Sequence, residues 1–278
     1  MDLFLSSMVL NNNLNRTGQY DFDSYGLEFS SGIPYSSESL ITFKKFYGSK
    51  LVHNYFPAAK IPFVLNLASL NNYILNKTID HCKSNIDITE KYSSRKIFSV
   101  HAGFLHDLEF SELGNKISRK VADKKQSFSR FIDSIKYLCK YAEKKNVHIL
   151  IENNVLINEN LLEDGSSPFF CTSSDDIIEL FDELDNIKNI GLLFDTAHFK
   201  VSCKTLNLDI DSEFLRIKHF IGALHHSDND GYYDSNEKLT KDYWFLKYIQ
   251  DFQKIYHVLE VKNLNKQEVS HQIKIMEL

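Results

Sequence analysis

The sequence predicts an α/β fold, a single (β/α)8 TIM barrel that takes up residues 1–278. A length of 278 residues is about the usual size of one such barrel. Apolar runs of strand length alternate with helical segments about eight times, which is typical of a parallel sheet and favours a closed barrel. Several of these runs end in polar residues, as expected where a barrel gathers the carboxyl ends of its strands on one face.

The predicted strands are short apolar runs bounded by polar or glycine-containing segments. We expect them at Leu3–Val9, Tyr25–Ser30, Lys50–His53, Lys96–His101, Val147–Glu152, Asn189–Asp195, Ile221–His225 and His257–Glu260. In the second of these strands, Glu28 can point into the mouth of the barrel.

The predicted helices have apolar residues at steps of three and four, most clearly between Ser127 and Lys145. Ser36 or Ser37 can cap the first helix, and Ser173 or Ser174 the fourth. We expect helices at Ser37–Phe46, Leu70–Ile86, Ser127–Lys145, Asp175–Leu184, Ser212–Phe220, Tyr243–Phe252 and Lys266–Met276. The charged stretch His106–Lys125 is predicted to be a flexible loop that could serve as a lid.

Composition limits the classes of function. With 32 basic and 37 acidic residues the net charge is −5, which argues against binding of duplex nucleic acid. The four cysteines form no CxxC pair and are expected to be reduced thiols. The first ten residues lack the basic start of a signal peptide, and no stretch has the length of a membrane span, so a cytoplasmic location is expected.

Four of the predicted strands end in residues that can bind a metal: Glu152, Asp195, His225 and Glu260. Each could merely mark the end of a strand, but four such coincidences favour a shared site at the barrel rim. Carboxylates with an imidazole suit Mn²⁺, Mg²⁺, Fe²⁺ or Zn²⁺.

Three further histidines, His53, His101 and His198, lie near the same predicted rim, so zinc and a second ion are possible. Alternatively, His53 and His101 are structural hydrogen-bonding residues. Lys200 could hold a substrate phosphate or carboxylate, or it could simply be solvated. Asp228 is another candidate for metal or substrate binding.

Several short runs, in a fixed order, carry a resemblance to a known family. Beginning with His53, they are Leu65–Ser69, Ser99–Gly103, Leu150–Asn154, Phe194–His198, Leu224–Asn229 and Val258–Glu260. Together they resemble the xylose isomerase-like TIM-barrel superfamily, which holds sugar and sugar-phosphate isomerases and epimerases as well as endonuclease IV.

The resemblance implies that Glu152, Asp195, His225 and Glu260 are the four ligands of a single metal, as in ketose epimerases, and that Glu152 and Glu260 are the catalytic residues that move the proton. These epimerases also carry an arginine soon after the matching histidine. The present chain has none soon after His225, so their substrate class is not transferred.

The resemblance to endonuclease IV implies that the site binds additional metal ions. There, His53 and His101 would bind another zinc shared with Glu152, and His198 would bind a further one; in epimerases His198 would contact substrate. Asp234 falls where the endonuclease has an Asp-x-His pair, but this chain has Asn236 in place of the imidazole. A complete cluster of three zinc ions is therefore in doubt.

Three hypotheses follow. The first is a metal-dependent sugar or sugar-phosphate isomerase or epimerase that acts by proton transfer through a metal-stabilised enediolate. The second is an endonuclease IV-like zinc phosphodiesterase. His53, His101, His198 and Asp234 favour it, whereas the negative net charge and Asn236 weigh against it. The third is a barrel that binds a metal or ligand without catalysis. The expected partner is a small sugar-like molecule and not a nucleic acid or a membrane, and a homodimer is a possible assembly.

Overall fold

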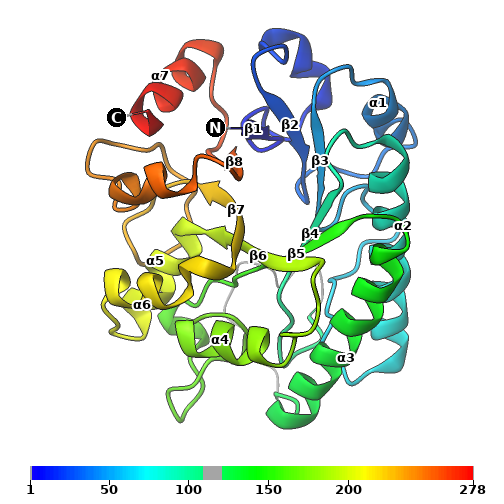
Figure 1. The fold of residues 1–278 in the computed structure, drawn as a ribbon, viewed down its shortest axis with the longest axis vertical. Helices are drawn as coiled ribbons and strands as arrows, with labels where there is room; N and C mark the ends of the chain where they lie inside the picture. Colours follow the sequence, from blue (N-terminus) through cyan, green and yellow to red (C-terminus); the bar gives the residue numbers. More distant parts are fainter. Residues whose placement is uncertain (1, 109–120, 278) are drawn as a thin grey trace.

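The computed structural model describes residues 2–108 and 121–277, and in these ranges the chain forms a closed barrel of parallel strands with helices around it (Figure 1). The strands follow one another around the barrel in sequence order, and β1 pairs with β8 to close it. The strands are β1 (Asp2–Ser6), β2 (Gly26–Phe29), β3 (Lys50–His53), β4 (Ile97–His101), β5 (His148–Glu152), β6 (Ile190–Asp195), β7 (Ile221–His226) and β8 (Tyr256–Leu259). The predicted (β/α)8 TIM barrel is confirmed.

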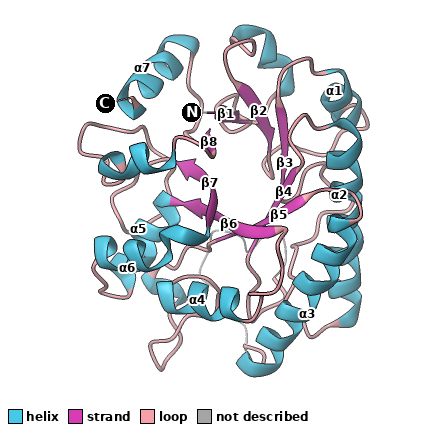
Figure 2. Ribbon diagram, in the orientation of Figure 1, coloured by secondary structure: helices cyan, strands magenta, loops and turns pink. Residues whose placement is uncertain are grey.

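The helices lie outside the ring of strands, as Figure 2 shows. The α-helices are α1 (Ser39–Lys45), α2 (Asn72–Tyr92), α3 (Lys124–Glu143), α4 (Ser174–Asp182), α5 (Thr196–Thr205), α6 (Ile210–Ile217) and α7 (Lys266–Met276). Short 3-10 helices are η1 (Leu14–Gln19), η3 (Asn158–Asn160), η4 (Lys218–Phe220) and η5 (Leu246–Phe252).

Alternation along the strands separates two apolar layers. Side chains that face inward, such as Leu51, Leu150, Leu193 and Val258, pack in the barrel interior in two small clusters. Those that face outward pack against the helices in one large core. The next inward position after an interior apolar residue therefore lies at the carboxyl end of its strand, where polar residues occur.

Side-chain caps fix the beginnings of several helices. The side chain of Asn265 accepts backbone N–H groups at the start of α7, and the backbone N–H of Asn265 donates to the carboxylate of Glu268. Ser173 caps α4, as predicted, and Asp195 caps α5. Because Asp195 also ends β6, strand and helix meet there without an intervening loop.

Some predicted elements were wrong. The helix α5 was not predicted. Only a 3-10 helix, η5, forms within the predicted helix Tyr243–Phe252. Helix α2 extends to Tyr92, six residues past the predicted end, and α1 begins at Ser39 without a side-chain cap from either predicted serine. Most of the predicted lid, residues 109–120, lies outside the described residues.

Two further predictions concern the whole chain. All four cysteines are free and buried, as expected for reduced thiols. Within the described ranges, no helix has the length and apolar character required to cross a membrane.

Candidate metal and catalytic site

Seven polar side chains meet at the carboxyl ends of strands β2 to β8. In most of these strands the polar residue follows an interior apolar residue by two positions, as Glu152 follows Leu150 and Asp195 follows Leu193. The seven residues are Glu28, His53, His101, Glu152, Asp195, His225 and Glu260. All except His101 are buried. The mouth of the barrel therefore holds a compact cluster of carboxylates and imidazoles.

Glu152 contacts imidazoles on both sides. Its Oε2 atom lies 3.2 Å from Nε2 of His53 and 3.3 Å from Nε2 of His101. Its Oε1 atom lies 3.3 Å from Nδ1 of His225. His53 and His101 thus face the cluster. Nδ1 of His53 also lies 2.9 Å from the Ser99 hydroxyl, which fixes the plane of the ring.

His225 has a carboxylate at each ring nitrogen. Nδ1 lies 2.7 Å from Oε2 of Glu260 and 3.8 Å from Oδ2 of Asp195. Nε2 lies 3.1 Å from Oε2 of Glu28, which reaches it from β2. Nδ1 of His225 therefore faces the other predicted ligands, while Nε2 contacts the carboxylate of Glu28 on the opposite side of the ring.

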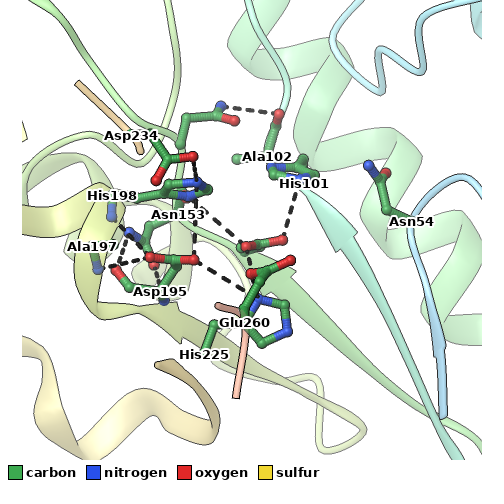
Figure 3. A network of polar contacts seen from close by, with 12 residues as sticks. Asn54, His101, Ala102, Asn153, Asp195, Ala197, His198, His225, Asp234 and Glu260 are labelled. Atoms are coloured by element: carbon green, nitrogen blue, oxygen red, sulfur yellow. Dashed lines mark hydrogen bonds and ion pairs between the residues drawn. The ribbon is translucent and has the colours of Figure 1, made fainter. Parts of the chain in front are cut away.

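The two carboxylate oxygens of Asp195 have different partners, one in the backbone of α5 and the other in the polar cluster. Oδ1 accepts the backbone N–H groups of Ala197 and His198, both at 2.8 Å. Oδ2 faces the cluster. Figure 3 shows Asp195, Glu260 and His225 together, with His198 and Asp234 on one side and His101 on the other.

His198 is held between backbone and carboxylate. Its Nδ1 atom lies 2.9 Å from the carbonyl oxygen of Asn153, so Nδ1 is the donor of that hydrogen bond. Its Nε2 atom lies 3.3 Å from Oδ2 of Asp234. Burial lowers the pKa of His198, but the carboxylates of Asp195 and Asp234 raise this pKa well above its usual value.

The four predicted ligands fit a divalent cation. One ligand atom from each of Glu152, Asp195, His225 and Glu260 lies within 4.8 Å of the others. Among the described residues, Oε2 of Glu152, Oδ2 of Asp195 and Nδ1 of His225 are buried atoms that have close polar neighbours in the cluster but form no hydrogen bond of proper geometry. Buried polar atoms are normally satisfied, so three such atoms in one cluster indicate a missing positive partner. Three carboxylates and one imidazole suit Mn²⁺, Zn²⁺ or Mg²⁺.

The charges of the cluster support the same interpretation. Burial raises the pKa of Glu152 to about 7 and that of Asp195 to about 6. Burial lowers the pKa of His225, but the carboxylates of Glu260, Glu28 and Glu152 raise it well above its usual value. The cluster therefore holds protons that a divalent cation would replace.

Two further groups of ligand-type residues adjoin the first. His53, His101 and Glu152 form one, and Glu28, His53 and His225 form the other. Glu28 was predicted to lie at the mouth, but its contact with His225 was not predicted. The alternation along β2 indicates only that Glu28 lies on the same face of the strand as Gly26 and does not indicate a partner on β7.

Lys200 and Asp228 lie outside these groups and pair with each other. Nζ of Lys200 lies 2.6 Å from Oδ1 of Asp228 and also contacts the carbonyl oxygen of Asn229. Asn236 is buried, and its amide nitrogen lies 3.4 Å from Oδ1 of Asp234. It brings an amide, not an imidazole, to the side of the site where His198 meets Asp234.

Comparisons with known proteins agree with this architecture. The sequence model of the xylose isomerase-like TIM barrel matches residues 19–266. No curated protein was found to match the chain by sequence.

Similar solved structures cover nearly the whole chain. A D-tagatose 3-epimerase-like protein is 16% identical, with a TM-score of 0.71 over 100% of this chain and 96% of its own. The TTHB071 protein from Thermus thermophilus, soaked with ZnCl2, is 17% identical, with a TM-score of 0.65 over 99% and 98% of the two chains. D-psicose 3-epimerase from Clostridium cellulolyticum, solved with D-tagatose, is 15% identical, with a TM-score of 0.60 over 99% and 90%. At these identities the similarity establishes the fold.

Proposed function

This chain belongs to the xylose isomerase-like TIM-barrel family, and from its site we propose that it is a divalent-metal-dependent isomerase or epimerase of a sugar or sugar phosphate. The observation that carries the proposal is the buried group of Glu152, Asp195, His225 and Glu260, whose ligand atoms lie within 4.8 Å of one another and three of which have a buried side-chain atom outside any hydrogen bond. The D-psicose 3-epimerase and the D-tagatose 3-epimerase-like protein among the similar structures support a sugar-like substrate.

The proposed metal ion, when bound, would polarise adjacent substrate oxygens and make the carbon-bound hydrogen next to them more acidic. Asp195 and His225 hold fixed positions in the cluster, because the backbone of α5 fixes one carboxylate oxygen and Glu28 fixes the far ring nitrogen. These two residues are proposed as ligands only.

Glu152 and Glu260 are proposed both to bind the metal and to move the proton. Both carboxylates approach Nδ1 of His225, at 3.3 Å and 2.7 Å, from different strands. One would remove a proton from the substrate carbon and the other, or the same one, would return it. Return to the opposite face gives an epimer, and return to the neighbouring carbon gives an isomer.

His101, His198 and Asp234 are proposed to contact the substrate. The side chains of His101 and Asp234 are 32% and 24% exposed, whereas that of Glu152 is 1% exposed, so these two lie nearer the entrance. His53, which is buried and lies 3.2 Å from Glu152, is proposed to orient the Glu152 carboxylate.

Elemental analysis and solvent exchange test the proposal together. Protein purified without chelator is analysed for bound metals, and it is then incubated in deuterated water with ketoses, aldoses and their phosphates. We expect one divalent ion per chain, and deuterium at a single carbon of at least one sugar. Glu143→Gln removes an exposed carboxylate at the end of α3 and is the control for loss of a carboxylate outside the proposed site. Protein without bound metal, or metal-loaded protein that exchanges no hydrogen on any sugar, would contradict the proposal.

A further inference from the structure

A chain of buried polar side chains runs behind the metal-ligand cluster, on the outer side of strands β7 and β8. The hydroxyls of Thr196 and Tyr243 lie 2.6 Å apart, and the Tyr243 hydroxyl lies 2.9 Å from Nδ1 of His226. Nε2 of His226 lies 2.9 Å from Nδ1 of His257, and Nε2 of His257 lies 2.9 Å from the carbonyl oxygen of Phe252. The four side chains are each at most 2% exposed.

One end of this chain fixes the direction of every hydrogen bond in it. A carbonyl oxygen only accepts, so Nε2 of His257 must carry a proton and donate to Phe252. In a neutral ring, Nδ1 of His257 then accepts from Nε2 of His226, and Nδ1 of His226 accepts from the Tyr243 hydroxyl. The Tyr243 oxygen accepts in turn from Thr196, whose single hydroxyl hydrogen then goes to the oxygen at 2.6 Å and not to the carbonyl oxygen of His225 at 3.0 Å.

The opposite direction fails at the same end. The Thr196 hydroxyl also lies 3.0 Å from the carbonyl oxygen of His225 and could donate there. Tyr243 would then donate to Thr196, His226 to Tyr243, and His257 to His226 through Nδ1. His257 would need a second proton on Nε2 to meet the Phe252 carbonyl, and burial lowers the pKa of His257 below its usual value. The direction from Thr196 to Phe252 is therefore the favoured one.

Two members of the chain, Thr196 and His226, directly follow proposed ligands at strand ends. Thr196 follows Asp195, and His226 follows His225. The backbone carbonyl of His226 accepts the N–H of Glu260, at 2.9 Å. The side chains of successive strand residues point to opposite faces, so the chain lies outside the barrel wall while the ligands lie inside.

We infer that Thr196, Tyr243, His226 and His257 are positioning residues, a directional hydrogen-bonded chain that fixes the ends of β6, β7 and β8 so that Asp195, His225 and Glu260 meet at one ion. The inference rests on the proposed function for the role of those three ligands. The direction of the chain and its effect on the backbone can be measured without a metal.

The tautomers are the first test. Nitrogen NMR of protein labelled in its histidines reports which ring nitrogen carries the proton. We expect His226 and His257 both to carry it on Nε2, in metal-free and metal-loaded protein alike. A proton on Nδ1 of either ring would overturn the direction of the chain.

The substitution Tyr243→Phe breaks the chain at its centre by removing one oxygen atom. Tyr248→Phe is the matched control, because the Tyr248 hydroxyl bonds Asp211, in the same region but outside the chain. We expect the backbone amides of Asp195 and Glu260 to exchange at least about tenfold faster with deuterated water in Tyr243→Phe and to be unchanged in Tyr248→Phe. Equal exchange in the two variants would overturn the positioning role.

Thr196→Val and Thr196→Ser provide a second pair, which keeps the test decisive if Tyr243→Phe does not fold. Valine removes the donor and serine keeps it, so faster exchange is expected in the first variant only.

In protein that binds metal, Tyr243→Phe and Thr196→Val are expected to weaken binding of the metal by about tenfold or more, measured by competition with a chelator. Unchanged affinity would overturn the inference alone. Wild-type protein that binds no metal would overturn the proposed function, whereas the tautomers and exchange rates would still decide the direction and the effect of the chain.

Discussion

Oε2 of Glu28 lies 3.1 Å from Nε2 of His225, so a carboxylate on β2 holds an imidazole on β7 from across the barrel mouth. The other ring nitrogen of His225 faces Glu152, Asp195 and Glu260. Metal-binding histidines usually donate their second N–H to such a partner, which orients the ring and raises its basicity. The contact with Glu28 would therefore make His225 a stronger ligand for the proposed metal ion.

Substitution of Glu28 is expected to weaken metal binding without preventing folding. Glu28→Gln keeps an acceptor for the His225 N–H but removes the charge, and Glu28→Leu removes both. We expect the dissociation constant of the metal to rise by about tenfold for the first variant and toward about 100-fold for the second, measured by chelator competition. Equal affinities for both variants and the wild type would contradict an orienting role for Glu28.

Glu152→Gln and Glu260→Gln are each expected to abolish turnover while the fold is nearly intact. Both side chains lie at the barrel mouth above the packed apolar interior, and an amide cannot take up a proton as a carboxylate does. We expect deuterium exchange into substrate to fall by about 1000-fold or more, with circular dichroism unchanged. Glu143→Gln is the control. Wild-type exchange in either variant, with metal still bound, would remove the proposed proton-transfer roles.

Much of the barrel and the positions of its four proposed ligands were predictable because a barrel has a simple geometry. The carboxyl ends of all eight parallel strands lie at the same rim of the barrel. The polar residues at the ends of β5 to β8 were therefore expected to lie close together. The structure brings their ligand atoms within 4.8 Å of one another. His53 and His101 were predicted to lie near the rim for the same reason, and both face Glu152.

Contacts between side chains on distant strands were beyond such reasoning. The pairing of Glu28 with His225 joins residues 197 positions apart, and nothing in either local sequence indicates it. Helix α5 was not predicted because the sequence Thr196–Thr205 mixes two lysines and one serine with its apolar residues, and because Asp195 was predicted to be a ligand and not also a helix cap. Both roles are compatible, since the two oxygens of Asp195 face different partners.

A pH-dependent stability is expected from His81 on α2, away from the site. Its ring stacks on Tyr55, with centroids 5.2 Å apart, and burial lowers the pKa of His81 to about 4. The unfolded chain takes up this proton near pH 6.5, so the contribution of neutral His81 is complete above that pH and is lost as the pH falls toward 4. His81→Phe keeps an aromatic ring without the titration.

Between pH 7.5 and 4.5, the wild type is expected to lose about 2 kcal/mol more of its free energy of unfolding than His81→Phe loses, measured by urea denaturation. His271→Gln, an exposed residue on α7, should behave as the wild type. An equal loss in the wild type and His81→Phe would show that the ring is protonated in both the folded and unfolded chains.

The last prediction is that this protein does not incise abasic DNA at a rate comparable with its action on a sugar-like substrate. Binding of duplex DNA draws much of its affinity from lysines and arginines that neutralise phosphates, and 32 basic against 37 acidic residues leave little surplus for a continuous basic groove. At the site itself, the amide of Asn236 stands 3.4 Å from Asp234, and an amide is a poorer zinc ligand than an imidazole. A third ion that bridges a phosphate would therefore be held weakly beside His198, whereas a small sugar needs neither a basic groove nor that ion. The assay incubates zinc-loaded protein with a duplex that carries one abasic site, in parallel with deuterium exchange on the sugar panel. Efficient strand cleavage without exchange on any sugar would overturn the isomerase proposal in favour of a phosphodiesterase.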